Sequence, residues 1–598
     1  MPGAVEQRAG RDGLIRLSVL ALDYDGTIAV DGVLDAKVRQ ALAEVRRQGI
    51  VVILVTGRKM GDLRRLIGRL HLFDAVVAEN GAVVAHPAAR SSKLLAQPPP
   101  PIFLQELRRR GIVAEAGECV VESPAGEAPR ILSVIRELEL PLVMIFNRGR
   151  LMVLPQATSK SSGLREALTT LRLSVHNALA IGDAENDHDL LATCEVGVAV
   201  AWGSPVLQRA ADLVLEGAGP ASVADYIRRL AAQQRLPATR TVRRRLLLGT
   251  QEDGADLSLA VRGRSVLISG DPKSGKSWIT GLLCEQFILQ GYSIFVIDPE
   301  GDYTSLEVLP GVLVLGEAKQ PPSLTEFTRL LHHPDVSVVA DLSVLPHAEK
   351  RRYVRSLLHL LATHRRQTGL PHRIVVDEAH YFLHDPDVLN LVDLNLSGYV
   401  LVTYQASQLH PDILAASEAI IVSRETDPQE LQALFKLHKL DATQEQLSPI
   451  LQKLALDEAV LFPGIEEAGG RLRKFWVAPR LSAHVRHRHK YLDVPVPSEQ
   501  AFLFTEGTQP PVQARTLKEF AEALSRATVQ SISGYLNRHD FSRWIDAVFG
   551  DYTLAAQIEA LEKQNGSRHE PVLRDAIIRL IEERYALGQP EREPTTSG

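Results

Sequence analysis

The stretch LALDYDGTIAVDG, residues 20–32, ends an apolar run with two carboxylates that stand one residue apart. Asp23 and Asp25 precede Gly26, which lets the backbone swing away from the strand. Ligands of parallel α/β sheets bind beyond the carboxyl ends of the strands. The stretch therefore predicts a strand of an α/β fold that ends in a pair of reactive carboxylates.

The same pattern recurs along the first 230 residues. Apolar runs that end in polar turns cover 17–23, 50–57, 74–82 and 178–187, and residues 36–49 have apolar positions at helical spacing. This alternation predicts a parallel sheet with crossover helices. Residues from about 84 to 155 break the rhythm and predict a small inserted α/β subdomain.

The polar residues at these predicted strand ends suit phosphoryl chemistry. Thr56 offers a hydroxyl for a phosphoryl oxygen, and Lys160 offers a positive charge. Asp183, Asn186 and Asp187 follow the fourth strand and supply oxygen ligands for magnesium. With Asp23 as nucleophile and Asp25 as acid and base, the set predicts a phosphate-transferring site.

The ordered motifs DYDGT, VTGR, Lys160 and GDAEND resemble those of the haloacid dehalogenase-like phosphatases, in the branch with an α/β cap. The resemblance implies that Asp23 forms an aspartyl-phosphate and that Asp25 protonates the leaving group and then activates water. It implies Thr56 and Lys160 as phosphate ligands. The implied magnesium ligands are Asp23, Asp183 and the backbone at Asp25, supported by Asn186 or Asp187. ENGA, residues 79–82, also resembles this branch, and Arg58 is either a substrate contact or a surface residue.

A second α/β unit is predicted from about 246 to 480. Its expected strands lie at 264–270, 293–299, 336–342, 373–379 and 398–405. GDPKSGKS, residues 270–277, fits the P-loop pattern, in which Gly270 and Gly275 let backbone amides wrap a phosphate chain. Lys276 is then expected at the β- and γ-phosphates of ATP and Ser277 at magnesium.

Further polar residues follow the later strands of this unit: Asp298, Glu300 and Asp302, then Asp377 and Glu378, then Thr403 and Gln405. A strand ending in Asp-Glu suits ATP hydrolysis, since a glutamate can polarise the attacking water. The order resembles the HerA/FtsK ATPases, hexameric motors that move DNA. The resemblance implies a RecA-like fold, Glu378 as catalytic base and Gln405 as a sensor near the γ-phosphate. Arg424 is a candidate arginine finger or an ion-paired strand-end residue.

The remaining segments are predicted to connect or extend these units. We expect a flexible N-terminus at 1–14, linkers at 231–245 and 481–500, a small helical module at 501–585 and a disordered tail at 586–598. HVRHRHKY, residues 484–491, suits a connector better than a phosphate or metal site, because no carboxylate or cysteine completes the set. Phe541 and Trp544 are expected in the core of the helical module.

Composition fits an ordinary globular chain of several domains. The 598 residues are 45% hydrophobic and 23% charged, with a formal net charge of -5. The three cysteines, Cys119, Cys194 and Cys284, supply neither a disulfide framework nor a zinc cluster. No apolar run reaches the roughly 18 residues that span a membrane. We expect a cytoplasmic protein without a membrane partner.

The sequence thus predicts a magnesium-dependent phosphatase for a small phosphorylated metabolite such as a sugar phosphate, fused to an ATP-hydrolysing motor or regulatory domain. Three alternatives stay open: a nucleic-acid end-processing phosphatase and kinase, a DNA-translocating ATPase with an accessory phosphatase, and an ATPase that acts as a slow binding switch. DNA and further copies of the chain, up to a hexamer, are candidate partners.

Overall fold

The computed structural model describes residues 15–68, 70–147, 149–239, 243–261, 265–316, 321–394, 396–437, 444–462, 472–482, 496, 501–505, 511–549, 552–564 and 570–585. The expected N-terminus 1–14, the His-rich stretch 484–491 and the tail 586–598 lie outside these residues. Among the described residues, no helix has both the length and the apolar character that crossing a membrane requires.

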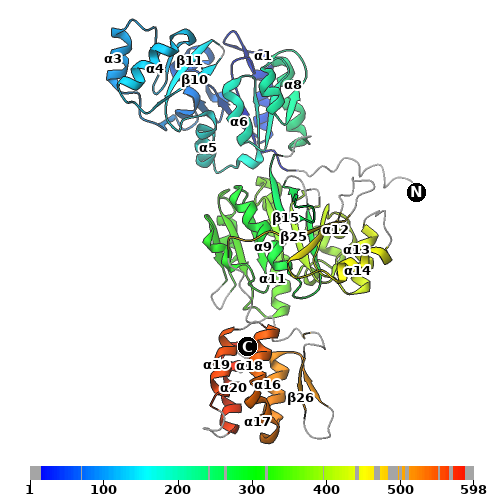
Figure 1. Cartoon of the computed structure of the whole chain (residues 1–598). Coiled ribbons are helices and arrows are strands. Elements are labelled where there is room, and N and C mark those ends of the chain that lie inside the picture. The colour runs from blue at the N-terminus through cyan, green and yellow to red at the C-terminus, as the bar shows by residue number, and fades with distance from the viewer. Residues whose placement is uncertain are drawn as a thin grey trace, which may run out of the picture.

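The N-terminal unit is built on a sheet that has eight strands among the described residues (Figure 1). Their order is β14 (Leu213–Leu215), β13 (Val196–Val200), β12 (Ala178–Gly182), β1 (Val19–Leu22), β4 (Val51–Val55), β5 (Ala75–Ala78), β6 (Val83–His86) and β7 (Ser91–Leu94). The six strands from β14 to β5 pair in parallel, as the sequence predicts. A short hairpin of β2 (Ala29–Val30) and β3 (Val33–Leu34) follows β1.

Helices cover both faces of this sheet, and each face has its own buried apolar cluster. The helices are α1 (Ala36–Arg47), α2 (Met60–Ile67), α5 (Lys160–Leu171), α6 (His188–Thr193), α7 (Pro205–Ala210) and α8 (Pro220–Gln233). Asp35 caps α1 by accepting hydrogen bonds from the backbone N–H groups of Lys37 and Val38. Gly49, with a φ of 84°, follows the end of the helix, where only glycine adopts this conformation without strain.

The cap is a separate layer with its own core. It comprises α3 (Pro101–Arg109), α4 (Ala128–Glu137) and a sheet of β10 (Leu142–Asn147), β11 (Arg150–Pro155), β9 (Val121–Pro124) and β8 (Glu115–Ala116). The inserted subdomain was expected to begin near residue 84, but β6 and β7 extend the main sheet as antiparallel strands. β6 (VVAH) is a short apolar strand and β7 (SSKL) is exposed and mostly polar, so the sequence alone does not assign them to a sheet.

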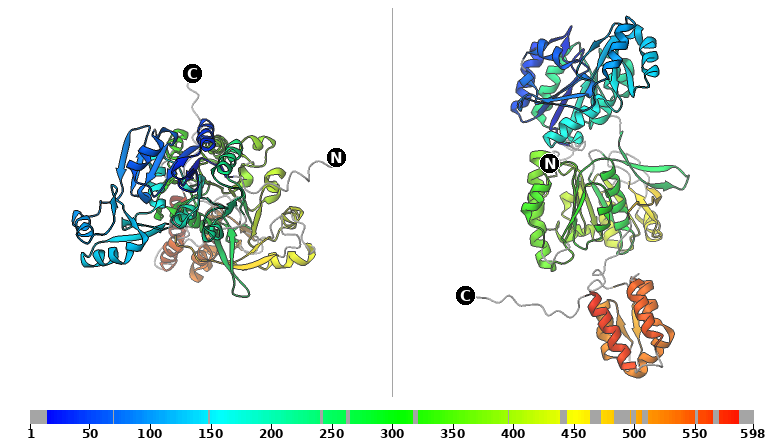
Figure 2. Two further views of the ribbon diagram at one scale, coloured as in Figure 1. Left: turned by 90° about the horizontal axis from the view of Figure 1, so that it is seen from above. Right: turned by 90° about the vertical axis from the view of Figure 1, so that its left-hand side faces the viewer.

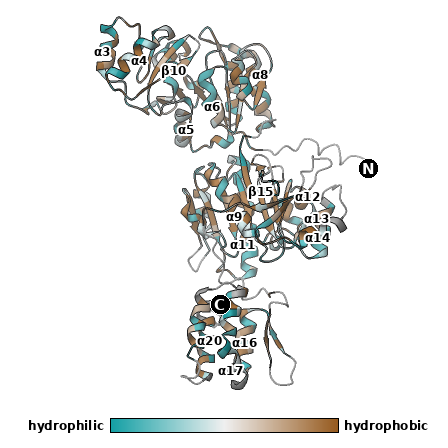
Figure 3. Ribbon diagram, viewed as in Figure 1, coloured by the Kyte–Doolittle hydropathy of each residue, from teal (hydrophilic) through white to brown (hydrophobic). Residues whose placement is uncertain are grey.

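The second unit holds a sheet that has eleven strands among the described residues. Their order is β16 (Asp256–Ala260), β15 (Arg245–Gln251), β25 (Arg473–Val477), β24 (Glu458–Leu461), β23 (Ala419–Val422), β17 (Val266–Ser269), β22 (Tyr399–Thr403), β21 (Arg373–Val376), β18 (Ile294–Asp298), β20 (Ser337–Asp341) and β19 (Val312–Leu315). The helices are α9 (Lys276–Leu289), α10 (Leu324–Leu330), α11 (His347–Thr368), α12 (Pro411–Ala415), α13 (Pro428–Leu437) and α14 (Gln444–Gln452). Apolar residues gather along the strands (Figure 3), and a buried cluster covers each face of the sheet.

The C-terminal module is mainly helical. The N-terminal unit, the second unit and this module lie one after another (Figure 2). It contains β26 (Phe502–Phe504), β27 (Val512–Ala514), α16 (Leu517–Arg526), α17 (Val529–Arg538), α18 (Asp540–Trp544), α19 (Tyr552–Glu562) and α20 (Glu570–Tyr585). Phe541 and Trp544 pack with Phe502 and Phe520 in its aromatic core. The predictions of an α/β fold class and of a core role for Phe541 and Trp544 are confirmed.

Candidate active sites

The first candidate site lies where three parallel strands end together. The last residue of β1 is in register with Ile181 of β12 and Leu54 of β4. The backbone N–H of Asp23 donates to the carbonyl oxygen of Ile181 at 3.0 Å. Asp23, Thr56 and Asp183 therefore follow neighbouring strands at one edge of the sheet, the edge at which α/β folds bind ligands.

Lys160 reaches this edge from the first turn of α5. Ser159 caps the helix, and its hydroxyl accepts the N–H of Ser162 at 3.3 Å. The Lys160 Nζ lies 2.6 Å from Asp23 Oδ1 and 2.6 Å from Asp187 Oδ1. Burial opposes the charge of this ammonium, but the two carboxylates outweigh it and raise the Lys160 pKa. Burial first, and then Asp187, raise the pKa of Asp23 to about 7.

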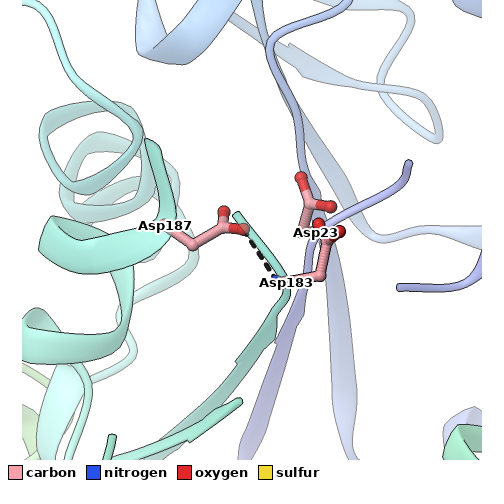
Figure 4. A group of neighbouring side chains, drawn as sticks. All are labelled: Asp23, Asp183 and Asp187. Atoms are coloured by element: carbon pink, nitrogen blue, oxygen red, sulfur yellow. Dashed lines mark hydrogen bonds between the residues drawn. The ribbon is translucent and has the colours of Figure 1, made fainter. Parts of the chain in front are cut away.

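Three buried carboxylates form a candidate metal site. Asp23, Asp183 and Asp187 each offer an oxygen, and these atoms lie within 4.8 Å of one another (Figure 4). The backbone N–H groups of Asp183 and Ala184 donate to Asp187 Oδ2 at 3.0 Å each, which orients that side chain. Magnesium prefers such oxygen ligands. Since Lys160 brings one positive charge against three carboxylates, the residues present fit a divalent cation.

Asp25 lies at the same strand end, but its side chain turns elsewhere. Arg58 donates from Nε to Asp25 Oδ2 and from Nη2 to Oδ1, both at 2.6 Å. The Asp25 side chain is 43% exposed, so it can turn toward a bound substrate. Thr56 is buried, and its Oγ1 accepts the backbone N–H of Arg58 at 3.2 Å. Arg58, for which the sequence left two roles open, is thus the ion-pair partner of Asp25.

The cap is fastened to the sheet by Glu79, the first residue of the ENGA motif. The buried carboxylate of Glu79 accepts the backbone N–H groups of Glu118, Cys119 and Val120 at 2.9, 2.7 and 3.0 Å. Asn80 lies beside the carboxylate cluster, where the Asn186 amide contacts it at 3.4 Å. No local pattern identifies the Glu79 contact, because the three donors lie about 40 positions later in the chain.

Two further side chains close the space between sheet and cap. Lys59 Nζ lies 2.6 Å from Glu115 Oε2 and 4.0 Å from Glu122 Oε2, both on cap strands. Met152 of β11 approaches Gly57 so closely that a Cβ there would lie 3.1 Å from its sulfur. Neither contact follows from the sequence, since each depends on how the cap docks. Together they hold the cap against the segment that follows β4.

The second candidate site is the P-loop between β17 and α9. Gly270, with a φ of 150°, packs so tightly that a Cβ would lie 2.1 Å from Ser423 Oγ. Lys276 Nζ donates to the carbonyl oxygens of Gly270 and Asp271 at 2.9 and 2.7 Å. Ser277 Oγ donates to Asp302 Oδ2 at 2.8 Å. The predicted P-loop residues therefore meet the acidic segment that follows β18.

The Asp-Glu pair follows β21, which is separated from the P-loop strand by β22. Asp377 and Glu378 are both buried, and Glu378 has a left-handed backbone with a φ of 47°. His380 Nδ1 lies 3.7 Å from Glu378 Oε2 and 3.1 Å from Thr403 Oγ1. The backbone N–H of Gln405 donates to Thr403 Oγ1 at 2.9 Å. The ends of β21 and β22 are thus linked through His380, whose pKa burial lowers to about 4.

Two other predicted polar residues of this unit have structural partners. Asp298 is fully buried and accepts the backbone N–H groups of Asp302 and Tyr303 at 2.9 and 3.0 Å. Burial raises its pKa well above the usual range. Arg424 Nε lies 3.5 Å from Asp271 Oδ2 of the same P-loop. The sequence left Arg424 as an arginine finger or an ion-paired residue at a strand end. In this single chain it is the ion-paired residue.

Two protein families match separate parts of the chain. Residues 20–99 and 132–227 match the haloacid dehalogenase-like hydrolases, and residues 251–385 match the central domain of the helicase HerA. The chain is 27% identical to a phosphoglycolate phosphatase from Methanopyrus kandleri over 227 residues, 36% of this chain and 97% of that protein. It is also 27% identical to a phosphoglycolate phosphatase from Aeropyrum pernix over 244 residues, 38% of this chain and 99% of that protein.

A solved haloacid dehalogenase-like hydrolase from Bacteroides thetaiotaomicron superposes with a TM-score of 0.32 and 18% identity. The match covers 36% of this chain and 100% of that one. The two family matches agree with the two sets of motifs and with the two sheets that carry them. The chain therefore joins a region similar to the haloacid dehalogenase-like hydrolases to a region similar to the central domain of the helicase HerA.

Proposed function

We propose that the phosphatase domain hydrolyses a small phosphomonoester through a covalent intermediate on Asp23. The observation that carries this proposal is the position of Lys160 Nζ, 2.6 Å from both Asp23 and Asp187 in a buried site. A buried nucleophile with a fixed cation beside it suits attack on a phosphoryl group.

In the proposed reaction, an oxygen of Asp23 bonds to phosphorus while the ester P–O bond breaks. Asp25 gives a proton to the leaving alkoxide and later takes one from water, which attacks phosphorus and releases phosphate from Asp23. Lys160 and the Thr56 hydroxyl hold the phosphoryl oxygens. The ion pair between Arg58 and Asp25 must break for Asp25 to act. The exposure of the Asp25 side chain allows that motion.

A magnesium ion bound by Asp23, Asp183 and Asp187 would neutralise phosphoryl charge. Burial of all three carboxylates in one cluster supports this ligand set. Asn186 and the Asp25 backbone complete the set that we propose.

We propose that the substrate is a small phosphorylated metabolite. The relatives named phosphoglycolate phosphatase match over 97% and 99% of their own length, so phosphoglycolate is the first candidate. Sugar phosphates are the second class, because the Asp25 side chain is 43% exposed and leaves room for a larger leaving group. The ordering of these candidates is tested by phosphate release from phosphoglycolate, from a panel of sugar phosphates and from 3'-phosphorylated DNA, with magnesium and with EDTA.

A preference of more than tenfold in kcat/KM for one small metabolite, abolished by EDTA, would support the proposal. Preference for 3'-phosphorylated DNA would instead favour nucleic-acid end processing. Transfer of the γ-phosphate of ATP to a 5'-hydroxyl would favour the kinase alternative, although Glu378 after β21 suits hydrolysis.

For the second domain we propose ATP hydrolysis, with Glu378 polarising water, Lys276 binding the β- and γ-phosphates, and Gly270 and Gly275 shaping the loop. Ser277 would bind magnesium, Asp377 would stand beside it, and Gln405 would sense the γ-phosphate. The Ser277–Asp302 contact supports a cation position at the loop. Stimulation of ATPase activity by DNA, with a hexamer in solution, would identify a motor, and slow unstimulated turnover by a smaller assembly would identify a regulatory switch.

A further inference from the structure

The phosphatase and ATPase domains meet through buried polar contacts. Ser18 Oγ donates to the carbonyl oxygen of Thr368 at 3.2 Å. Tyr292 OH donates to Glu195 Oε2 at 2.9 Å, and the Tyr292 ring stacks on His176 with ring centroids 3.7 Å apart. The interface therefore orders specific side chains of both domains rather than joining them by a linker alone.

A cavity of about 20 Å³ lies within this interface. Arg16 lines it from the phosphatase domain, while Tyr292, Arg365, His372 and Arg373 line it from the ATPase domain. A single water needs about 10–15 Å³ by the same measure. The cavity therefore has room for one small ion and no room for a nucleotide.

Arg365 of α11 brings a buried positive charge into this cavity, and its guanidinium lies over the Tyr399 ring. Arg365 is 5% exposed, and its Nη2 donates to the carbonyl oxygens of His372 and Ser397. Its Nη1 is buried and has no hydrogen-bond partner among the described residues. Burial lowers the Arg365 pKa, and Tyr399 and the carboxylate of Asp393 offset only part of this effect. A buried guanidinium with an unused donor is costly unless an anion meets it.

Arg373 of β21 brings a second buried charge to the same place. A Cβ on Gly398 would lie 2.6 Å from Arg365 Nη2 and 2.7 Å from Arg373 Nη1, so both guanidinium groups converge on this glycine. Burial is the main cause that lowers the Arg373 pKa to about 10, and the nearby Arg365 acts in the same direction, while Tyr292, Glu195 and Glu418 oppose it. Two like charges that converge in a buried site repel each other, which an anion between them would relieve.

His372, which also lines the cavity, does not add to this charge. Its Nδ1 accepts the backbone N–H of Ser293 at 2.9 Å, so the proton of the neutral ring lies on Nε2, 3.2 Å from Asn177 Oδ1. Burial lowers its pKa well below the usual value. The cavity thus combines fixed arginine charge with a neutral imidazole.

We propose that this interdomain cavity binds one small oxyanion, with Arg365 and Arg373 as its buried ligands and Arg16 closing the site from the phosphatase domain. Inorganic phosphate, the product that phosphatase and ATPase reactions share, carries the matching charge. A small carboxylate has the same acceptor chemistry. Because both domains contribute arginine, occupancy would tighten their contact. The site is distinct from the carboxylate cluster and from the P-loop, so it goes beyond the proposed function.

The test titrates the full chain with inorganic phosphate by calorimetry, in EDTA and in a low-chloride buffer, so that metal-dependent binding at the two active sites is suppressed. The variants are Arg365→Gln and Arg16→Gln, and the matched control is Arg366→Gln, which lies one residue along α11 and faces solvent. We expect one phosphate per chain in the wild type and in the control, and at least tenfold weaker binding in both cavity variants. If Arg365→Gln does not fold, the half-buried Arg16→Gln carries the comparison alone.

Acetate titrated in parallel distinguishes the two oxyanion sources, and tighter binding of acetate than of phosphate would assign the site to a carboxylate. Equal phosphate affinity in wild type, Arg16→Gln and Arg365→Gln would overturn the site. The site would also be overturned if phosphate binding were lost in Lys160→Met or Lys276→Met but retained in the arginine variants. The phosphate would then occupy an active site.

Discussion

Lys160 and Asp23 are 137 positions apart in the chain, yet Lys160 Nζ lies 2.6 Å from Asp23 Oδ1 in a fully buried site. The contact joins the first turn of α5 to the end of β1. The same Nζ also contacts Asp187, so one lysine balances the negative charge of the proposed nucleophile and of the candidate metal site.

Lys160→Met removes that charge while keeping most of the length of the side chain. The buried carboxylates then lose their counter-charge, which typically costs about 3–5 kcal/mol. We expect the thermal unfolding of the phosphatase domain to shift downward in the absence of metal, and phosphatase kcat to fall by about 100-fold or more. Unchanged kcat would remove Lys160 from the phosphate site. Recovery of the unfolding midpoint by magnesium would indicate that the cation takes over part of the lysine's role.

Gly81 determines where Lys160 lies. Its φ is 101°, and a Cβ there would lie 1.8 Å from the carbonyl oxygen of Ser159. Gly81→Ala therefore must displace the start of α5, and we expect a loss of more than about 2 kcal/mol in the free energy of unfolding. Gly61→Ala is the matched control, since no atom lies within 4 Å of its added Cβ in α2, and it should be neutral or stabilising by up to about 1 kcal/mol. Chemical denaturation measures the free energy of unfolding of both variants. Equal values would contradict the packing described for Gly81.

The two activities should separate by mutation. Glu378→Gln removes the proposed base of the ATPase, and we expect ATP hydrolysis to fall by about 100-fold or more with nucleotide affinity retained. Phosphatase activity should persist. Glu307→Gln changes an exposed carboxylate of the same domain and should leave both activities intact. ATPase turnover by Glu378→Gln at the wild-type rate would show that another group polarises the water.

The motifs of both sites were predictable because they are local. Asp23, Thr56 and Asp183 follow apolar runs, and the order of strands in a parallel sheet brings such ends together. The partners of Glu79, Arg58 and Arg365 were not predictable, since each contact depends on how separate segments pack. The same reason explains why β6 and β7 were grouped with the cap. The short sequences of these two strands do not indicate which sheet they join.

Stability should fall in mild acid. The pKa of His372 is lowered by burial, so the unfolded chain binds a proton near the usual histidine pKa of about 6.5 and the folded chain does not. Its contribution to stability is therefore present above that pH and is lost as the pH falls below it, by at most about 1.4 kcal/mol per pH unit. We expect the unfolding midpoint of the wild type to drop between pH 7 and pH 5. His372→Gln should weaken this pH dependence, and an unchanged pH profile in that variant would assign the effect to other buried histidines.

The central claim is that Asp23 is the nucleophile of a metal-dependent phosphatase. We would measure phosphate release from phosphoglycolate and from p-nitrophenyl phosphate in magnesium by wild type, Asp23→Asn and Asp31→Asn. Asp31 is exposed and has a φ of 50°, which asparagine tolerates, so its variant is the matched control. The account predicts a loss of about 1,000-fold or more in Asp23→Asn, with Asp31→Asn and the ATPase unaffected. Phosphatase activity of Asp23→Asn at the level of the wild type would contradict it.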